Sequence, residues 1–586
     1  MNYFDNEKEW LWLFENGIDW DAIINLYYPS FPTEDGLENK EEVLDFFKEL
    51  LTSTGHWAAT SVAERSMKLD EQGPGSIENG RTIPGEALSE LYKEASELQV
   101  FGLPLPRKFG GLETPSVLLM ILLEQLSRAC LSSSTQVAFF TSIAEMVHRY
   151  TDEETAMRIV PKIIEGKLSG SMNLTEPGCG SDLGMIKTSA TPCEDGSYLL
   201  NGNKIFITNG GGGVSFVLAR IKDAPEGLKG ISLFLCEQDV EGKDEPNYIV
   251  AKNEHKLGMH GSFTCEIVYE NSKSHLVGDP GEGFKYMLHL MNEARIAVGM
   301  QALGLIEASI GYARTYADER VQFDRPISDL PLMRRNLEDF ETERDAIRAL
   351  LVDTISHFDI FQKLDLKKNQ SQDLTKEEEN LYSEANLWTR KRTPLVKYYA
   401  CEAATNLTTK AVQVLGGYGF MKEYPVERFH RDSFGPLLYE GTSQIQALMA
   451  LKDVVKYAMK DPKRFFSNVL FKHPTTELLS DAGECSIAFK KVHFRFKKNM
   501  IALLVKCLRP ELATDLLNPK AWANEEKLNG LMSHAETLCQ ALSYMETLRV
   551  LCEHAKKDES RFDLYQRYEK LIRPRLEAIY CDWDIR

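Results

Sequence analysis

The chain has 586 residues, of which 43% are hydrophobic and 26% are charged, and its formal net charge at pH 7 is -19. These values are typical of a soluble globular protein with two to four packed units. The negative charge disfavours nonspecific binding to nucleic acid or to an anionic membrane. No run of roughly 18 uninterrupted apolar residues predicts a membrane span.

The 11 cysteines are scattered along the chain and form no CxxC pair. The N-terminal residues also lack the basic and apolar regions of a secretory signal. Together these features predict a reducing, cytoplasmic location. They argue against a disulfide framework and against a metal site.

Apolar residues at helical spacing begin the chain. Runs such as EEVLDFFKELL and PSVLLMILLEQLSRAC predict a helical domain over residues 1–165. From 166 to 285 the pattern changes to short β-branched and aromatic runs, such as VSFVLARI and GISLFLCE. These runs are separated by turn residues and predict a β domain of roughly a hundred residues.

Two dipeptides in this β region are typical of tight turns. Asp195-Gly196 and Asn201-Gly202 both combine a residue that tolerates the left-handed conformation with a glycine. Both pairs are therefore interpreted as hairpin turns.

Helical periodicity returns over residues 286–460. It is interrupted by a charged stretch at 359–380, which is interpreted as an exposed loop or an extended helical hairpin. Residues 461–586 are again helical in pattern and predict a small additional helical domain. The predicted fold class is therefore mainly α, with an inserted β domain and a C-terminal helical extension.

One basic run lies in that extension. Its members are Lys490, Lys491, Arg495, Lys497 and Lys498. They are interpreted as the solvated face of a helix.

The first segment with chemical character is TEPGCGSDLG, residues 175–184. Its glycines let the backbone approach a ligand closely, and Thr175 and Ser181 add hydroxyls. This suits a phosphate or a polar ring edge, although a plain surface turn fits the pattern as well. The glycine spacing differs from the Rossmann fingerprint.

The strand segment KIFITNGG places Phe206 and Thr208 two residues apart, so regular alternation would put both on one face. Such a pair could stack on a flat heterocycle and hydrogen-bond to it. An ordinary half-buried strand explains the pattern equally well.

Two further segments end helices. Arg320 closes one helical run, and its fork of donors suits phosphate or pyrophosphate unless it is simply exposed at the helix end. QVLGGYGF, which begins at Gln413, runs into Gly416-Gly417. A plain helix C-cap explains this pattern, but one glycine would suffice for a cap, so the doubled glycine also fits a ligand that lies against the backbone.

The stretch PLLYEGTSQIQ contains the strongest catalytic candidate, Glu440. Ser443 and Gln446 fit a capping box, so Glu440 would lie just ahead of a helix N-terminus. The apolar stripe of that helix is predicted as Ile445, Leu448, Val455 and Met459. The helix dipole favours the carboxylate anion while apolar neighbours oppose it, which can poise a general base. Gly441 removes a side chain that would block a substrate carbon.

In this order, TEPGCGSD, FITNGG, ERVQFDRPI, QVLGGYGF, Arg431-Asp432 and YEGTSQIQ resemble the acyl-CoA dehydrogenase family. The resemblance covers about residues 85–460. The longer N-terminus, the stretch at 359–380 and the C-terminal extension resemble a larger bacterial branch. That branch includes 3-methylmercaptopropionyl-CoA dehydrogenases and broad-range fatty acyl-CoA dehydrogenases.

The resemblance implies an N-terminal helical domain, a middle β-barrel-like domain and a helical bundle. It implies α,β-dehydrogenation of an acyl-CoA thioester to the trans-2-enoyl-CoA with FAD as cofactor. Glu440 matches the family's base, and its own backbone N–H would stabilise the thioester oxygen together with a ribityl hydroxyl of the flavin. Electrons would pass to an electron-transfer flavoprotein, and the chain would form a homodimer or a dimer of dimers.

The resemblance also implies site residues. The positions that match flavin contacts are Met172, Leu174, Thr175, Gly180, Ser181, Phe206, Ile207 and Thr208. The positions that would reach the FAD of a neighbouring subunit are Arg320, Gln413, Gly416 and Gly417, and Thr442 and Gln444 would close over the adenosine part. The positions that would face the substrate are Ser181, Arg295 and Gly441.

Phe206 stands where tryptophan is commonest in the family, so stacking is kept and the indole donor is lost. Some relatives carry the base on the helix just before the arginine that matches Arg295, where this chain has Ala294. Glu293 would point about 100° away from that position on a helix. The segment at 132–146 is expected to line the acyl pocket.

Two other functions are compatible with these motifs. One is a flavin oxidase of the same fold that uses oxygen on an acyl-CoA or a related carbon acid. The other is a non-catalytic acyl-CoA-binding or scaffold protein. The acyl chain length cannot be inferred from the sequence.

Overall fold

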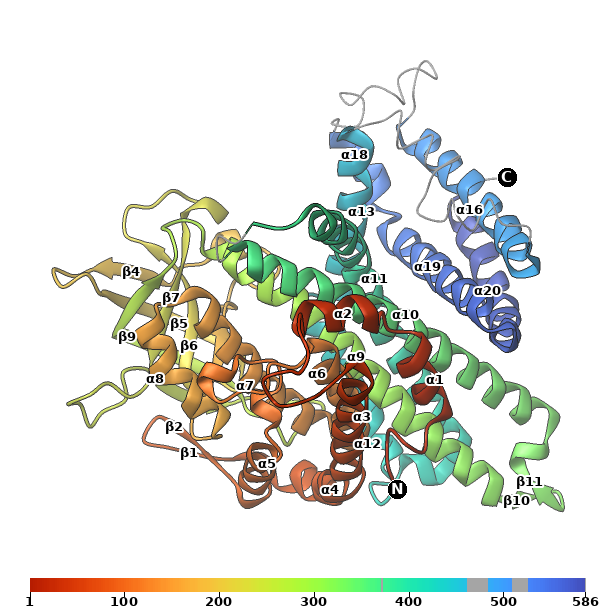
Figure 1. The fold of residues 1–586 in the computed structure, drawn as a ribbon, viewed down its shortest axis with the longest axis horizontal. Coiled ribbons are helices and arrows are strands. Elements are labelled where there is room, and N and C mark those ends of the chain that lie inside the picture. The colour runs from red at the N-terminus through yellow and green to blue at the C-terminus, as the bar shows by residue number, and fades with distance from the viewer. Residues whose placement is uncertain (370–372, 461–482, 509–524, 585–586) are drawn as a thin grey trace.

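The computed structural model describes residues 1–369, 373–460, 483–508 and 525–584. Helices form most of the molecule, and a β domain lies against one end of a long helical bundle (Figure 1). The C-terminal helices lie beside the bundle on another side (Figure 1). The predicted fold class, mainly α with an inserted β domain and a C-terminal helical extension, is confirmed.

The N-terminal region is helical with one interruption. Its helices are α1 (Lys8–Asn16), α2 (Trp20–Tyr27), α3 (Lys40–Trp57), η1 (Ala58–Val62), α4 (Ala63–Gln72), α5 (Glu86–Glu97), η2 (Val100–Gly102), η3 (Arg107–Phe109), α6 (Ser116–Ala129), α7 (Leu131–Tyr150) and α8 (Glu153–Ile164). Between α4 and α5 a two-stranded hairpin, β1 (Gly75–Glu78) and β2 (Arg81–Pro84), interrupts the expected helical pattern.

The β domain is a nearly closed sheet. Its strands are β3 (Ser169–Asn173), β4 (Ser189–Pro192), β5 (Tyr198–Thr208), β6 (Gly213–Ile221), β7 (Ile231–Glu237), β8 (Ile249–Asn253) and β9 (Thr264–Val277), with the short helices η4 (Leu183–Met185) and η5 (Leu228–Gly230). The strand order β3-β6-β4-β5-β9-β7 is closed by an added pairing of β7 with β6, and β8 pairs with β9. Closure of this kind removes exposed strand edges, which explains the barrel-like shape.

One of the two predicted hairpin turns is correct. Asp195-Gly196 lies in the turn between β4 and β5. Asn201-Gly202 lies inside β5, so the turn interpretation is wrong there. Gly202 has φ +151°, and a Cβ atom at this position would lie 2.5 Å from the Thr188 hydroxyl oxygen, so the glycine permits a close backbone approach.

The bundle is made of long helices. They are α9 (Gly283–Glu319), α10 (Pro331–Asn369), α11 (Lys376–Leu415), α12 (Val426–Leu438) and α13 (Ser443–Lys460), joined by β10 (Val321–Gln322), β11 (Arg325–Pro326), η6 (Ile327–Asp329) and η7 (Gly416–Phe420). The charged stretch at 359–380 extends α10 and α11, as the helical hairpin alternative predicted. Its first part is not exposed, because Asp359 and Leu364 are buried.

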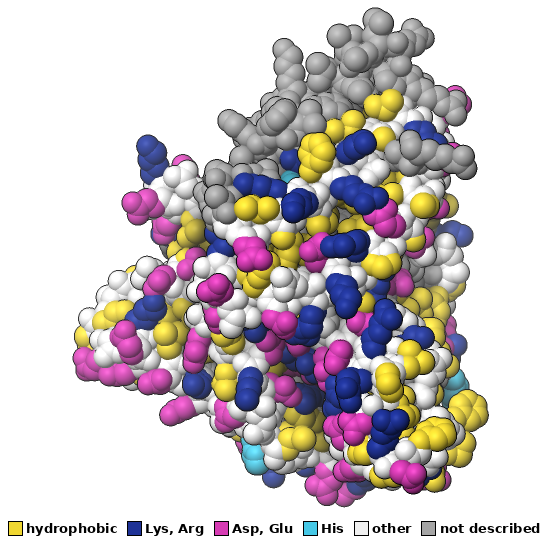
Figure 2. Space-filling view, turned by 90° about the vertical axis from the view of Figure 1, so that its right-hand side faces the viewer, with side chains coloured by type: hydrophobic (Ala, Val, Ile, Leu, Met, Phe, Trp, Pro, Cys, Tyr) yellow, Lys and Arg dark blue, Asp and Glu magenta, His cyan; other side chains and the backbone are white. Residues whose placement is uncertain are grey.

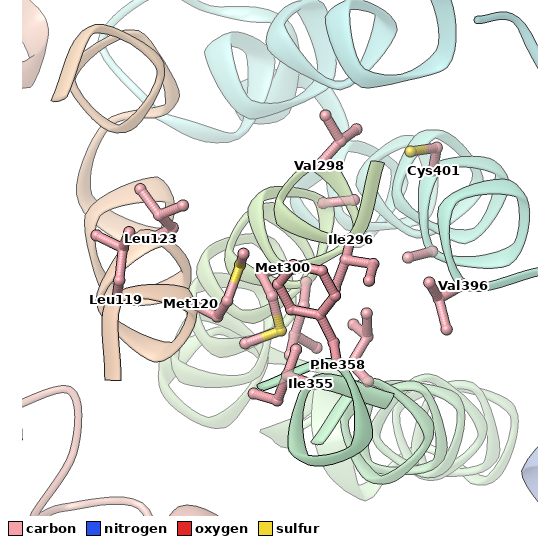
Figure 3. Packing of buried hydrophobic residues seen from close by; sticks show 14 of the residues in the cluster. Leu119, Met120, Leu123, Ile296, Val298, Met300, Ile355, Phe358, Val396 and Cys401 are labelled. Atoms are coloured by element: carbon pink, nitrogen blue, oxygen red, sulfur yellow. The ribbon is translucent and has the colours of Figure 1, made fainter. Parts of the chain in front are cut away.

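Helix α9 is the central element of the bundle. Within the described residues it alone is long and apolar enough to cross a bilayer, but 83% of its apolar window is buried inside the protein. Side chains from α6, α10 and α11 converge on it: Figure 3 shows Met120, Met300, Phe358 and Val396 in one apolar cluster. Helix α9 is therefore a core helix.

The described C-terminal helices are α16 (Glu484–Leu508), α18 (Glu525–Met532), α19 (Ala535–Lys557), η10 (Glu559–Arg561) and α20 (Phe562–Asp582). Residues 461–482 and 509–524 of the predicted extension lie outside the described part. Charged groups join α19 to the bundle: Arg392 of α11 is fully buried and pairs with Asp353 of α10 and with Glu546 of α19. The indole of Trp12 donates to Asp558, which links the two ends of the chain.

Lysine and arginine side chains gather on the face formed by these C-terminal helices and the neighbouring bundle (Figure 2). In the predicted basic run, Lys491, Arg495 and Lys498 are exposed, as expected for a solvated helix face. Lys497 is an exception, because it points inward and is buried.

Candidate active site

Glu440 lies in a short loop between α12 and α13, three residues before the helix begins at Ser443, so it stands just ahead of a helix as predicted. Its backbone has φ +57°, in the left-handed region that L-residues with long side chains rarely adopt. Gly441 follows with φ +94°. Strained residues of this kind persist only where their surroundings hold them, and they cluster at functional sites.

Three buried side chains hold this base loop, residues 437–441, by its carbonyl groups. Arg295 of α9 donates its Nε to the carbonyl of Glu440 at 3.2 Å. Gln446 of α13 donates its amide to the carbonyls of Glu440 and Gly441 at 2.9 and 3.1 Å. Lys397 of α11 donates to the carbonyls of Leu437 and Gly441 at 3.2 and 2.7 Å.

These contacts correct the predicted capping box. The Ser443 hydroxyl donates to Glu402 at 2.5 Å, and the Gln446 amide is used by the base loop. The predicted apolar stripe is correct in part: Val455 and Met459 pack against the core, but Leu448 is 38% exposed, and the buried residues of this face also include Ala447, Leu451 and Ala458. This inner face of α13 packs against α11 and α19.

The Glu440 side chain is half-buried. Burial raises its pKa above the ordinary value, while the positive charges of Arg295 and Lys397 act in the opposite direction. Within the described part of the chain no residue hydrogen-bonds to its carboxylate, and its backbone N–H also finds no acceptor there. A carboxylate and a neighbouring N–H are thus both available to a ligand.

The segment at 132–146 lies close to this loop. The Tyr439 hydroxyl donates to Gln301 at 3.1 Å, and the Gln301 amide reaches the hydroxyls of Ser134 and Thr135, both at 3.4 Å. These contacts join the residue before the base to α9 and α7. That residues 132–146 line the acyl pocket stays a prediction.

Glu293 does not compete as a base. It is buried and faces Gln362 of α10, whose amide approaches Glu293 at 3.5 Å and Glu145 at 2.6 Å. Burial, followed by the neighbouring Glu145, raises the pKa of Glu293 well above its ordinary value. Its neighbours are Glu145 of α7 and Gln362 of α10, and in the described structure no hydrogen bond joins it to the base loop.

The two flavin-facing segments of the sequence lie side by side in the β domain. The Ile205 N–H donates to the carbonyl of Thr175 at 3.0 Å. Met172 lies buried in β3, Leu174 and Thr175 are half-buried, and Gly180 and Ser181 are exposed. The fold thus brings TEPGCGSD and KIFIT together.

A buried ion pair that the sequence did not indicate supports this arrangement. Lys204, which is fully buried, donates to Glu176 at 2.8 Å and to the Leu174 carbonyl at 3.0 Å. Glu176 also accepts from the N–H groups of Lys187 and Thr188. The sequence contained one indication of this ion pair: a lysine, Lys204, inside an otherwise apolar strand segment.

The prediction that Phe206 and Thr208 share one face of a regular strand is wrong. The register of β5 against β9 shifts between Lys204 and Ile207, and Phe206 has φ +59°. This β-bulge turns the Phe206 ring outward, where it is 61% exposed, while Ile207 is buried. A bulge next to a binding site commonly re-aims one side chain in this way.

The exposed Phe206 ring and three hydroxyls fit a flat heterocycle with polar edges. Among the described residues, none accepts from or donates to the hydroxyls of Thr175, Ser181 and Thr208. A Cβ atom at Gly178 would meet nothing within 4 Å, and one at Gly180 would meet only the Thr175 methyl at 3.5 Å, so the loop is open. These residues fit the isoalloxazine ring of FAD.

The residues predicted to reach a neighbouring subunit's FAD lie at the other end of the bundle. Arg320 caps the end of α9 and lies 5.8 Å from the centre of the Tyr418 ring, while Gln413, Gly416 and Gly417 are exposed nearby on α11 and η7. The β domain packs against the beginning of α9. A helix of this length spans about 55 Å, so one chain does not bring both groups onto one flavin.

Two other predicted residues have partners within the chain. The Gln444 amide donates to Glu536 of α19 at 2.9 Å, so the C-terminal helices contact the helix that follows the base. Thr442 accepts through its carbonyl from Gln446. The roles of Thr442, Gln444 and Arg295 toward FAD or CoA stay predictions.

Two hollows in the described structure lie elsewhere. One of about 250 Å³ is lined by residues 221–225 and 229–232 and by the 280–281 turn, and one of about 360 Å³ lies between α16 and α20. Neither includes Glu440 or Phe206. The candidate catalytic and flavin-binding residues therefore lie outside both hollows.

Comparison with known families matches residues 48–167 to "Acyl-CoA dehydrogenase, N-terminal domain", 171–272 to the middle domain and 281–455 to the C-terminal domain. The chain is 34% identical over 367 residues to an acyl-CoA dehydrogenase of Bacillus subtilis, covering 62% of this chain and 89% of that one. It is 31% identical over 438 residues to 3-methylmercaptopropionyl-CoA dehydrogenase of Ruegeria pomeroyi, covering 71% and 72%.

Among solved structures, an acyl-CoA dehydrogenase from Bacillus anthracis in complex with FAD matches 92% of this chain and 88% of its own with a TM-score of 0.74, at 22% identity. That likeness extends the shared fold over nearly the whole chain.

The protein is an oxidoreductase with the acyl-CoA dehydrogenase fold. It belongs to the acyl-CoA dehydrogenase family, as its motifs predicted, and that family depends on FAD.

Proposed function

We propose that the protein catalyses FAD-dependent α,β-dehydrogenation of an acyl-CoA thioester to the trans-2-enoyl-CoA. The observation that carries the proposal is the base loop, where the Glu440 side chain is half-buried, its carboxylate has no hydrogen-bond partner in the described structure, and the charges of Arg295 and Lys397 act on it. A carboxylate whose pKa is raised by burial is a stronger base than an ordinary one, which suits it to accept a proton.

Within this proposal the Glu440 carboxylate removes the proton from the carbon next to the thioester carbonyl. The negative charge that then grows on the carbonyl oxygen is met by the backbone N–H of Glu440. Arg295, Gln446 and Lys397 fix the loop from behind, so the carboxylate and the N–H keep their relative positions. Bound FAD would accept the hydride from the β carbon.

The proposed binding site for the flavin ring is the surface around Phe206. Thr175 and Thr208 would hydrogen-bond to the ring edges, and the exposed Phe206 side chain would pack on the ring. Lys204 and Glu176 hold the loop that carries these groups.

We propose further that the protein acts as a homodimer or a dimer of dimers. The end of the bundle that carries Arg320 also exposes several large apolar side chains, which are costly to leave in water. They are Phe323 (80% exposed), Phe420 (80%), Leu332 (72%) and Val321 (55%). A second copy that covers this surface would bring Arg320 and Gln413 to its partner's flavin.

The test is Glu440→Gln, which keeps the shape of the side chain and removes its basicity. Purified protein should contain yellow FAD, and rapid mixing with acyl-CoA should bleach the wild-type flavin. The variant should keep its FAD and bleach about 10²- to 10⁴-fold more slowly. Fast bleaching by the variant would contradict the assignment of the base.

The electron acceptor is tested in the same preparation. We expect an electron-transfer flavoprotein to reoxidise the flavin and oxygen to do so poorly, as the family resemblance implies. Rapid oxygen uptake without added acceptor would instead identify an oxidase, and purification without FAD would favour a non-catalytic binding protein. A survey of acyl-CoA chain lengths by the same bleaching assay would define the substrate, and we propose that the protein acts in the cytoplasm.

A further inference from the structure

Lys397 of α11 is a fully buried lysine beside the base loop. Its ammonium group donates to the carbonyl of Leu437 at 3.2 Å and to the carbonyl of Gly441 at 2.7 Å. These two carbonyls lie on either side of Tyr439 and Glu440. The side chain thus ties together the beginning and the end of the loop that carries the base.

The rest of α11 fixes where this lysine lies. Its neighbour Val396 and the following Cys401 pack into the apolar core with Ile296 and Val298 of α9 (Figure 3). Core packing of this density leaves the helix little freedom to shift. The ammonium group is therefore held at a fixed point behind the loop.

Burying an ammonium group costs several kcal/mol unless its hydrogen bonds and charge are compensated. In the described structure Lys397 has two carbonyl acceptors and no carboxylate within ion-pair distance. The nearby Glu402 carboxylate accepts instead from the Ser443 hydroxyl. A charge kept without a carboxylate partner in this way acts on its wider surroundings, which include Glu440.

We propose that Lys397 is a positioning residue of the dehydrogenation site: by tying the carbonyls of Leu437 and Gly441 it turns the carboxylate and N–H of Glu440 toward the thioester, and its charge favours the ionised base. This inference rests on the proposed function. It concerns the geometry and ionisation of the base, because Lys397 itself is shielded by the loop.

The charges around the base can be stated. Arg295 from α9 and Lys397 from α11 act on Glu440. Burial lowers the pKa of Lys397 and the charge of Arg295 adds to this, while Cys401, Glu440 and Glu402 act in the opposite direction. Gln446, the α13 residue that touches the loop, is neutral. Burial raises the pKa of Glu440 and both cations oppose this rise, so loss of the Lys397 charge should raise that pKa further.

The experiment compares Lys397→Met, which removes both the donors and the charge, with Lys397→Gln, which keeps a neutral donor. The control is Lys391→Met, which removes a lysine from the same helix where it pairs with Glu546 of the C-terminal extension. Each protein is purified with FAD, and the limiting rate of flavin bleaching by acyl-CoA is measured over a range of pH.

For Lys397→Met we expect a limiting rate lower by about 10²-fold, with little change in KM, because the base is misplaced rather than the substrate lost. The acidic limb of the pH profile should move to higher pH in both Lys397 variants. Hydrogen exchange of the 437–442 amides should rise in Lys397→Met. The Lys391→Met control should change none of these three quantities.

The inference would be overturned if Lys397→Met had the same limiting rate, the same pH profile and the same hydrogen exchange of the loop amides as the wild-type protein. If that variant does not fold, Lys397→Gln decides, since an unshifted acidic limb there contradicts the role of the charge. Failure of the wild-type protein to bleach with any acyl-CoA would instead overturn the proposed function. The two failures are therefore distinguishable.

Discussion

Two loops are each supported by a fully buried lysine: the base loop, and the loop at 174–181 that is predicted to face the flavin, here called the flavin-facing loop. The groups that compensate the charge of the buried lysine differ between the two loops. Lys204 donates to one carbonyl and forms an ion pair with Glu176 at 2.8 Å. Lys397 donates to two carbonyls and has no carboxylate partner in the described structure. Glu176 neutralises the charge of Lys204, whereas no carboxylate of the described residues pairs with the charge of Lys397.

Under the proposed function, the difference follows from what each loop does. The flavin-facing loop needs only a fixed shape, so a local ion pair with two further N–H donors to Glu176 serves it well. The base loop carries a carboxylate that must stay free to take a proton. A carboxylate partner for Lys397 would cancel the charge that helps Glu440 ionise, whereas neutral carbonyls hold the loop and leave that charge in place.

The largest effect on stability is expected for Lys204→Met. It leaves Glu176 buried without its cation, which costs about 3–5 kcal/mol in comparable cases. The urea-unfolding midpoint should fall, and FAD should be lost during purification because the loop at 174–181 loses its support.

The matched control is the double variant Lys204→Met/Glu176→Leu, which removes both charges. Replacing a buried ion pair by apolar residues is often close to neutral, so much of the stability should return. If Lys204→Met alone retains both stability and FAD, the ion pair does not support the flavin-facing loop.

A smaller effect is expected for Gly441→Ala in the base loop. The residue has φ +94°, and an added Cβ would lie 2.9 Å from the Gln446 amide nitrogen and 3.1 Å from the Ile445 side chain. Backbone strain of this kind costs about 1–3 kcal/mol. The bleaching rate should fall while bound FAD is kept.

Gly311→Ala provides the control for this substitution. The position lies within α9, and a Cβ there meets nothing within 4 Å. The change should be neutral or stabilising by about 0.5–1 kcal/mol, as for other glycines inside helices. Equal destabilisation by both variants would remove the special role of the base loop.

The smallest effect concerns the free energy of unfolding that is lost when Glu440 ionises in the folded protein. The pKa of Glu440 is raised in the folded protein, so its contribution to stability is present at low pH and is lost as the pH rises through that pKa. Glu440→Gln lacks this loss. Its stability relative to wild type should therefore increase with pH and then level off.

Urea-unfolding midpoints of the two proteins at a series of pH values would measure this trend. A difference that does not depend on pH would show that the fold does not oppose ionisation of Glu440. The ion pair of Lys204 and Glu176 is the same in the wild-type protein and in Glu440→Gln. It should therefore contribute nothing to the pH-dependent difference between their unfolding midpoints.

The sequence predicted much of this architecture because its periodicities are long and its glycine motifs are specific. The helices at 283–319 and 376–415 and the position of Glu440 just ahead of α13 agree with the pattern. Asn201-Gly202 shows the limit: a turn-like pair lies inside β5, where the backbone passes close to Thr188, the residue before β4. Local pattern cannot report an approach from elsewhere in the chain.

The same limit applies at the site. Ser443 and Gln446 fit a capping box locally, but Glu402 and the base-loop carbonyls offered them tertiary partners. Phe206 fits a regular strand, but a shift of register against β9 turned it outward. In each case a contact between distant segments outweighed a local preference.

By itself, the sequence determined which residue types carry the chemistry, the order of helical and β regions, and membership of the acyl-CoA dehydrogenase family. The tertiary structure alone decided which backbone carbonyls Lys397, Arg295 and Gln446 hold, and that Lys204 pairs with Glu176. The physical reason is that periodicity encodes which face is buried, whereas compensation of a buried charge depends on groups that only folding brings together.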